Sequence, residues 1–68
     1  MIWTTRWKQI EGFPDYYVSD DGRVFSMKRM KVMNLFEKHG QKYVKMTNNY
    51  QQYQRNVDNL RRAAFRGE

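Results

Sequence analysis

The sequence contains no cysteine and only one proline. Without thiols it can form neither a disulfide framework nor a cysteine-ligated metal site, so packing and hydrogen bonds must hold it together. No uninterrupted apolar run exceeds three residues, the length of the run at 63–65, and this is too short for a membrane span or for the apolar part of a secretory signal. We therefore expect a soluble protein of a reducing cytoplasm.

The length of 68 residues leaves room for one small domain, because a chain of about this size buries only about 60% of the surface that its unfolded form exposes. Aromatic residues make up 16% of the chain, and each large ring brings much buried area. We therefore expect a single folded basic domain over residues 1–68.

The charge is strongly one-sided, with 13 Lys and Arg against 7 Asp and Glu and a formal net charge of +6. Such a chain attracts polyanions, and nucleic acid is the commonest polyanion in a cytoplasm. Composition alone leaves non-specific RNA binding and solubility as alternative uses of the charge.

The first half of the chain predicts β-structure. Residues 7–10 form a candidate strand that ends at the Gly-Phe-Pro-Asp sequence of residues 12–15, and residues 16–19 and 23–27 flank an Asp-Asp-Gly turn at 20–22. Ser19 and Ser26 are expected to satisfy backbone groups at strand ends. Strand alternation places Tyr17, Arg23 and Phe25 on the face away from the core, and the expected core residues are Trp7, Ile10, Tyr16, Val18 and Val24.

The second half has its clearest alternation in residues 41–47, with Val44 and Met46 on one side and Tyr43, Lys45 and Thr47 on the other. Turns are expected at 28–31, 37–40 and 48–49, strands at 32–36 and 52–57, and a helix at 59–65. Asp58 is the expected helix cap, Gly67 the expected stop, and Val57, Leu60 and Ala64 the apolar helix face. The three-residue recurrence of Met27, Met30 and Met33 leaves a short helix as the alternative to the strand at 32–36.

These patterns predict an α+β fold that is mostly β. The expected architecture is a small antiparallel sheet of three to five strands with one short C-terminal helix.

Two blocks of fixed spacing carry a family resemblance. Residues 7–13 read W-x-x-I-x-G-aromatic, and residues 16–26 read Y-x-V-S-x-x-G-x-V-x-S. This pattern resembles the small modular DNA-binding segment at the N-terminus of HNH homing endonucleases, many of them encoded by bacteriophages. Residues 40–46 are similar to the strand that follows in those enzymes, and residues 57–65 to their next helix.

The resemblance implies a small antiparallel sheet that lies against DNA, without the nuclease part. Asp58 stands where the family has a histidine, and the family's catalytic segment would begin where this sequence ends. His39 is the only histidine and is expected in a solvated turn. We therefore expect no catalytic residues, no metal site and no cofactor.

The function that these observations favour is that of a non-catalytic protein that binds double-stranded DNA, of bacteriophage origin. The alternative is a phage protein that takes part in host takeover by binding and inhibiting a host nucleic-acid enzyme or defence complex through an acidic or DNA-binding host surface. An inert remnant of a homing endonuclease is the third interpretation.

Candidate contact residues come from the charge and aromatic patterns. The densest cations are Lys28, Arg29 and Lys31, and the last helix carries Arg61 and Arg62, which equally suit the helix dipole. Lys42 and Lys45 lie on opposite faces of one strand, so Lys45 is expected to face a DNA groove and Lys42 to contact phosphate from a rim. The candidate nucleic-acid contacts are Arg23, Lys28, Arg29, Lys31, Lys42, Lys45, Arg61 and Arg62, and the candidate base-stacking residues are Tyr17, Phe25 and Tyr43.

Overall fold

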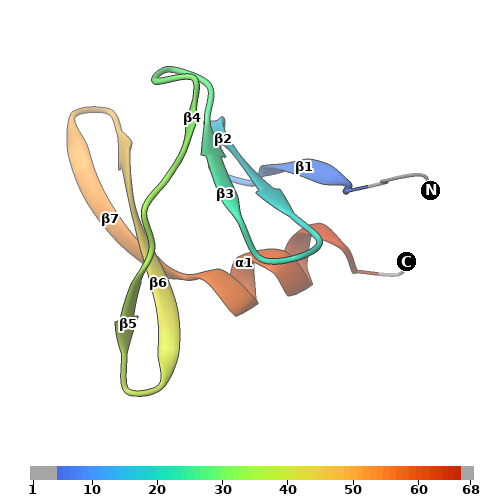
Figure 1. The fold of residues 1–68 in the computed structure, drawn as a ribbon. Helices are drawn as coiled ribbons and strands as arrows, with labels where there is room; N and C mark the ends of the chain where they lie inside the picture. The colour runs from blue at the N-terminus through green and yellow to red at the C-terminus, as the bar shows by residue number, and fades with distance from the viewer. Residues whose placement is uncertain (1–4, 67–68) are drawn as a thin grey trace.

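The computed structural model describes residues 5–66, which form two antiparallel sheets and one helix (Figure 1). The first sheet has the order β1-β2-β3-β4 and the second β5-β6-β7. The predicted class is confirmed: the fold is mostly β and antiparallel, with one short C-terminal helix. The elements are β1 Trp7–Ile10, β2 Phe13–Ser19, β3 Val24–Ser26, β4 Lys31–Val32, β5 Phe36–Lys38, β6 Gln41–Asn48, β7 Gln51–Asn56 and α1 Val57–Ala64.

The β2–β3 hairpin has the predicted register. Val18 lies opposite Val24 and Tyr16 opposite Ser26, and all four residues are buried. Gly22 adopts a φ of 88° in the connecting turn, a conformation that glycine takes without steric cost. The Ser19 hydroxyl accepts a 2.8 Å hydrogen bond from the Arg23 N–H, so the serine satisfies a backbone donor at the strand end as expected. The Ser26 hydroxyl likewise accepts from a backbone N–H in the next turn, that of Arg29.

Strand β1 corrects one predicted core residue. Ile10 is buried, but the Trp7 side chain is 36% exposed and packs edge-on against Phe25 with ring centroids 6.1 Å apart. Residues three positions apart in a strand point to opposite faces, so Trp7 and Ile10 cannot share the core. The prediction that Trp7 is a core residue is wrong, whereas Val18 is fully buried as predicted.

The segment after Gly12 is a strand for most of its length. Gly12 makes the turn with a φ of 86°, and Phe13, Pro14 and Asp15 belong to β2. The register between β1 and β2 shifts at the turn end of β1. The interruption predicted for residues 12–15 is therefore confined to the turn before Phe13.

The predicted strand at 32–36 is divided between the two sheets. Strand β4 ends at Val32 in the first sheet, and β5 begins at Phe36 in the second. Between them Met33 donates a 2.7 Å backbone hydrogen bond to Val24, and Met33 and Leu35 pack against the core. The segment is thus a crossover between sheets, and the alternative of a helix through the methionines is wrong.

The second sheet is built from two hairpins that share β6. Val44 and Met46 are fully buried on one face of β6, as the alternation predicted. The β5–β6 turn consists of His39 and Gly40, so residues 37 and 38 belong to β5 instead of the turn. The β6–β7 turn lies at residues 49–50, one residue later than predicted.

Helix α1 begins earlier than predicted. Asn56 is its N-cap and accepts a 3.1 Å hydrogen bond from the Asn59 N–H, while Asp58 lies in the first turn. The predicted cap, Asp58, was therefore two residues too late. Asn and Asp are both good caps, and the helix starts directly after β7, which ends at Asn56. Val57 is buried and Leu60 and Ala64 pack against the core, which confirms the predicted apolar face. The predicted stop at Gly67 lies outside the described residues.

The core lies where the two sheets and the helix meet. Val18 and Val24 come from the first sheet, Val44 and Met46 from the second, and Val57 from α1. The Tyr16 hydroxyl also accepts a 3.0 Å hydrogen bond from the Thr47 N–H, across the two sheets. No helix within residues 5–66 is long and apolar enough to cross a membrane.

Candidate nucleic-acid interface

A groove with a volume of about 490 Å³ lies between the turn after β3 and the second sheet. We call it the basic groove, because four cations and no carboxylate line it within the described chain. Three of the predicted contacts, Arg29, Lys31 and Lys45, are brought together here, and Lys38 joins them. The lining residues are Arg29, Lys31, Met33, Asn34, Leu35, Phe36, Lys38, Lys45 and Gln54.

The four cations of the basic groove are exposed and make no ion pair within residues 5–66. Their positive charge is therefore available to a partner. By contrast, three other predicted contacts form ion pairs: Arg23 Nη2 lies 3.1 Å from Asp21 Oδ2, Lys28 Nζ 3.9 Å from Asp15 Oδ2, and Arg61 Nη2 3.4 Å from Asp58 Oδ1.

One aromatic ring, that of Phe36, forms part of the groove wall. Phe36 and Tyr43 lie opposite each other in β5 and β6 and stack with ring centroids 5.9 Å apart at 26°. The Lys45 ammonium lies 5.7 Å from the centroid of the Phe36 ring, within the range of a cation–π interaction. Tyr43, predicted to stack on bases, therefore already stacks on a protein ring.

The groove also contains two side-chain amides that have no hydrogen-bond partner within the described residues. Neither the Asn34 nor the Gln54 side chain makes a hydrogen bond within residues 5–66, and Gln54 lies opposite Lys45 in the β6–β7 register. By contrast, the amides that support the fold are bonded within it: Gln9, Gln41, Asn48, Gln51 and Asn56. The groove therefore offers neutral donors beside its cations.

The five other predicted contacts lie outside the basic groove, and one of them, Lys28, pairs with Asp15. Lys42 lies opposite Glu37 in the register, on the other face of β6 from Lys45, as the alternation predicted. Arg61 and Arg62 line hollows beside α1 that they share with Asp20. Acidic neighbours reduce the attraction of these cations for a polyanion.

Arg23 belongs to the β2–β3 turn. Its Nε donates to Asp21 Oδ1 over 3.2 Å, and its guanidinium lies 5.5 Å from the Trp7 ring centroid. The hydrogen bond from the Ser19 hydroxyl, and secondly the one from Arg23, hold the pKa of the Asp21 carboxyl below its ordinary value. These contacts stabilise the β2–β3 turn.

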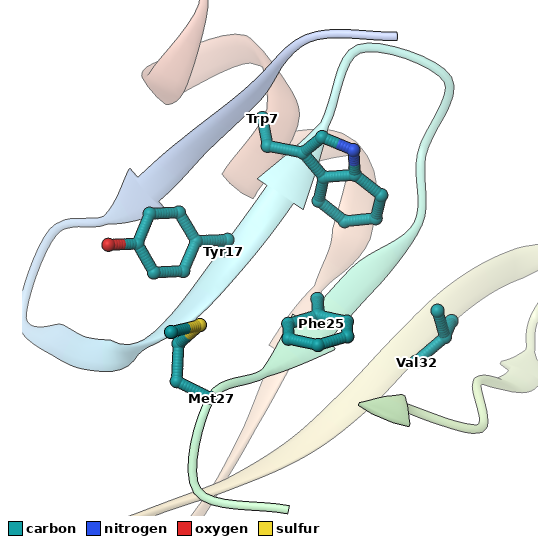
Figure 2. A pocket seen from close by; sticks show the side chains of 5 residues that line it. All are labelled: Trp7, Tyr17, Phe25, Met27 and Val32. Carbon is teal, nitrogen blue, oxygen red and sulfur yellow. The ribbon is translucent and has the colours of Figure 1, made fainter. Parts of the chain in front are cut away.

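The other aromatic candidates line a hollow of about 430 Å³ on the outer face of the first sheet. Figure 2 shows their side chains around it. We call it the apolar hollow, because its walls are apolar groups from four strands and the turn after β3. The lining residues are Trp7, Tyr17, Phe25, Met27 and Val32.

Sequence reasoning missed several exposed residues of these surfaces. Lys38 was assigned to a turn, and Asn34 and Gln54 were assigned to strands without a role; Trp7 was assigned to the core. A signal for Lys38 existed, because pairing residues 36–38 with 41–43 places it on the same face as Phe36, Tyr43 and Lys45. Residues 5–66 contain no group of three or more His, Cys, Asp or Glu side chains that could hold a metal ion.

Comparison with known proteins places this geometry in a family. Residues 6–54, which include every residue that lines the basic groove, match the NUMOD4 motif. The fold is similar to that of a solved structure of the HNH homing endonuclease I-HmuI, whose subject is DNA binding and cleavage by that enzyme. The TM-score is 0.84 and the sequence identity is 27%. The match covers 93% of this chain and 38% of the endonuclease chain. No curated protein matches the sequence.

The resemblance to the modular N-terminal segments of homing endonucleases, first seen in residues 7–26, is thereby confirmed. The matched residues make up more than half of the sequence, and the chain belongs to the NUMOD4 family.

Proposed function

We propose that this chain is a non-catalytic module that binds double-stranded DNA, of bacteriophage origin, and that the basic groove holds the phosphate backbone. The observation that carries the proposal is the meeting of four cations in one groove of a NUMOD4 chain. They come from the turn after β3 and from β4, β5 and β6, and they form no ion pair within residues 5–66. A concave surface of this kind suits the convex phosphate backbone of a duplex.

The groove chemistry fits phosphate binding. Lys and Arg that neutralise phosphates release condensed counterions, which supplies most of the non-specific affinity. Free amides such as Asn34 and Gln54 can donate hydrogen bonds to phosphate oxygens and so fix the orientation of the protein on the duplex. The β6–β7 hairpin is a two-stranded ribbon, an element that the major groove of DNA admits.

The non-catalytic part of the proposal rests on side-chain chemistry. His39 is the only histidine, and it occupies an exposed two-residue turn. Metal-assisted phosphodiester cleavage needs side chains that fix a metal ion and activate water. We therefore assign binding, and no cleavage, to these residues.

Two triple variants test the groove with equal changes of charge. In one, Arg29, Lys31 and Lys45 become Gln; in the control, Lys42, Arg61 and Arg62 become Gln. The plot of log K against log salt should become shallower by roughly 2.7 in the groove variant, at about 0.9 for each phosphate that the protein no longer neutralises. The control should keep the wild-type slope.

Two outcomes would contradict the proposal. Equal loss of slope in both variants would show that general charge attracts DNA and that the groove has no special role. If the wild type bound no duplex at about 50 mM salt, where even non-specific contacts are strengthened, DNA binding would have to be abandoned.

A second candidate function is binding to a host protein to inhibit a nucleic-acid enzyme or defence complex. The apolar hollow favours it, because Trp7, Met27 and Val32 are 36%, 46% and 45% exposed on one sheet face, and aromatic and methionine side chains are enriched at protein interfaces. Capture of one stoichiometric host protein after nuclease treatment, lost in the Trp7→Ala variant, would support this function. Recovery of nucleic acid alone would contradict it.

A further inference from the structure

Tyr50 stands at the apex of the β6–β7 hairpin with its side chain fully exposed, at 103% of the reference area. The next most exposed large hydrophobic residue of the described chain is Met30, at 68%. Neither the Tyr50 ring nor its hydroxyl makes a contact of the hydrogen-bonding or ring type within residues 5–66. The fold therefore makes no use of this side chain.

The backbone at Tyr50 is also unfavourable for a tyrosine. The two hairpins of the second sheet have the same kind of turn: His39 and Gly40 have φ values of 54° and 75°, and Asn49 and Tyr50 have 54° and 64°. Two positive φ values favour Asn followed by Gly. Gly40 fits this rule, whereas a tyrosine in the left-handed region is strained. The chain thus keeps a strained conformation that displays an aromatic ring.

The hairpin that carries Tyr50 is a long, regular arm. Six residue pairs join β6 to β7, from Tyr43 opposite Asn56 to Asn48 opposite Gln51. Figure 1 shows the β6–β7 turn projecting away from α1, in the same direction as the β3–β4 turn. At about 3.4 Å per residue, the apex lies about 14 Å along the strand from Lys45 in the basic groove. A duplex held in the groove therefore has its base edges within reach of the tip.

We infer that Tyr50 is a base-contacting residue that inserts its ring against a base step of duplex DNA while the basic groove holds the backbone. This inference rests on the DNA binding proposed above. Aromatic rings stack on any base because every base has a π-face, and apolar wedges partly unstack base steps. The preceding residue, Asn49, has a side-chain amide that makes no hydrogen bond within residues 5–66 and that can donate to and accept from base edges. Insertion should be easiest at flexible pyrimidine–purine steps.

Substitution of Tyr50 tests the inference without harming the fold. Tyr50→Gly and Tyr50→Asn both place a residue that tolerates positive φ in the turn, so the thermal midpoint should stay the same or rise. Each variant should bind duplex DNA about fivefold to hundredfold more weakly, the range expected for one lost base–aromatic stack. The salt slope should not change, because tyrosine carries no charge. Tyr50→Phe should bind like the wild type.

Gly40→Tyr is the matched control at the other hairpin of the sheet. It places a tyrosine at a φ of 75° with open space around the added Cβ, so it should lower the thermal midpoint and leave DNA affinity unchanged. A duplex with 2-aminopurine at a TA or CA step gives a direct signal. Its fluorescence should rise on binding of the wild type and Tyr50→Phe, and stay low with Tyr50→Gly.

The outcomes separate this inference from the proposed function. If the wild type binds duplex with a steep salt dependence and Tyr50→Gly binds equally well, Tyr50 contacts no base and only the inference fails. A rise in 2-aminopurine fluorescence with Tyr50→Gly would overturn it in the same way. Absence of wild-type binding to any duplex would overturn both.

Discussion

The hydroxyl of Tyr16, in the first sheet, accepts a hydrogen bond of 3.0 Å from the backbone N–H of Thr47, in the second. Tyr16 is 7% exposed, and its ring also lies edge-on to Phe13. The bond joins residues 31 positions apart in the sequence. It joins β2 of the first sheet to β6 of the second, the strand that carries Lys45 of the basic groove.

Tyr16→Phe should therefore destabilise the protein while leaving the ring packing in place. Loss of one hydrogen bond of this kind costs about 0.5–1.5 kcal/mol, which chemical denaturation can measure. Tyr17→Phe is the matched control, since Tyr17 is the next residue on the opposite sheet face and its hydroxyl has no partner within the described residues. Equal stability of the two variants would show that the Thr47 bond contributes nothing.

Core truncations should follow burial as the structure has it. Met46 is fully buried between the sheets, so Met46→Ala should cost about 2–5 kcal/mol, comparable to the whole stability of a small domain. Trp7→Ala removes a larger side chain, yet Trp7 is 36% exposed, so the variant should stay folded with a cooperative thermal transition. Circular dichroism melts compare the two. An unfolded Trp7→Ala chain would contradict this expectation and show that Trp7 contributes as much stability as a core residue.

Local patterns were sufficient for the hairpins. The alternation around Val18 and Val24, together with Gly22 in the turn, determined both the β2–β3 register and its buried face. The same holds for Val44 and Met46 in β6. Each of these expectations depends only on neighbours in sequence, and strand periodicity and turn chemistry are local properties.

The groove could not be predicted because it depends on contacts between distant residues. Arg29 and Lys45 are 16 positions apart, and they meet only because residues 33–35 cross from one sheet to the other. The sequence predicted one continuous strand at 32–36, and such a strand would not cross between the sheets. Trp7 was misplaced for a different reason: its motif partner Ile10 is three residues away, and in a strand that spacing reverses the face.

Asn56 and Asp58 both support the start of α1, by different means. Asn56→Ala removes a side chain that accepts from the Asn59 N–H, and such a loss costs about 0.5–2 kcal/mol. Asp58→Ala removes a charge that favours the helix N-terminus and pairs with Arg61. At about 1 M salt the charge effect should be screened, whereas the cap effect should remain. Urea denaturation at low and high salt distinguishes them, and a salt-sensitive Asn56→Ala effect would contradict the capping role.

Asp21 should make folding stability depend on pH. Hydrogen bonds from Ser19 and Arg23 lower its pKa in the folded state, so its carboxylate stabilises the fold above the ordinary aspartate pKa of about 3.9. That contribution is lost as the pH falls through the lowered, folded-state pKa. The stability difference between wild type and Asp21→Asn should be constant from neutral pH to about pH 5 and then shrink in acid. A difference that grows in acid would show that the pKa is raised instead.

The groove and the hairpin tip should act independently on DNA. Lys45 and the tip are separated by about 14 Å along β6, beyond the distance at which substitutions usually couple. The losses of binding free energy in Lys45→Gln and Tyr50→Gly should therefore add in the double variant to within about 0.5 kcal/mol, and only Lys45→Gln should make the salt slope shallower. Lys45→Gln with Phe36→Leu is the control, because the Lys45 ammonium lies over the Phe36 ring and the effects of the two substitutions should not add. Strong coupling between Lys45 and Tyr50 would mean that both serve one contact, and the division between a backbone-holding groove and a base-contacting tip would be wrong.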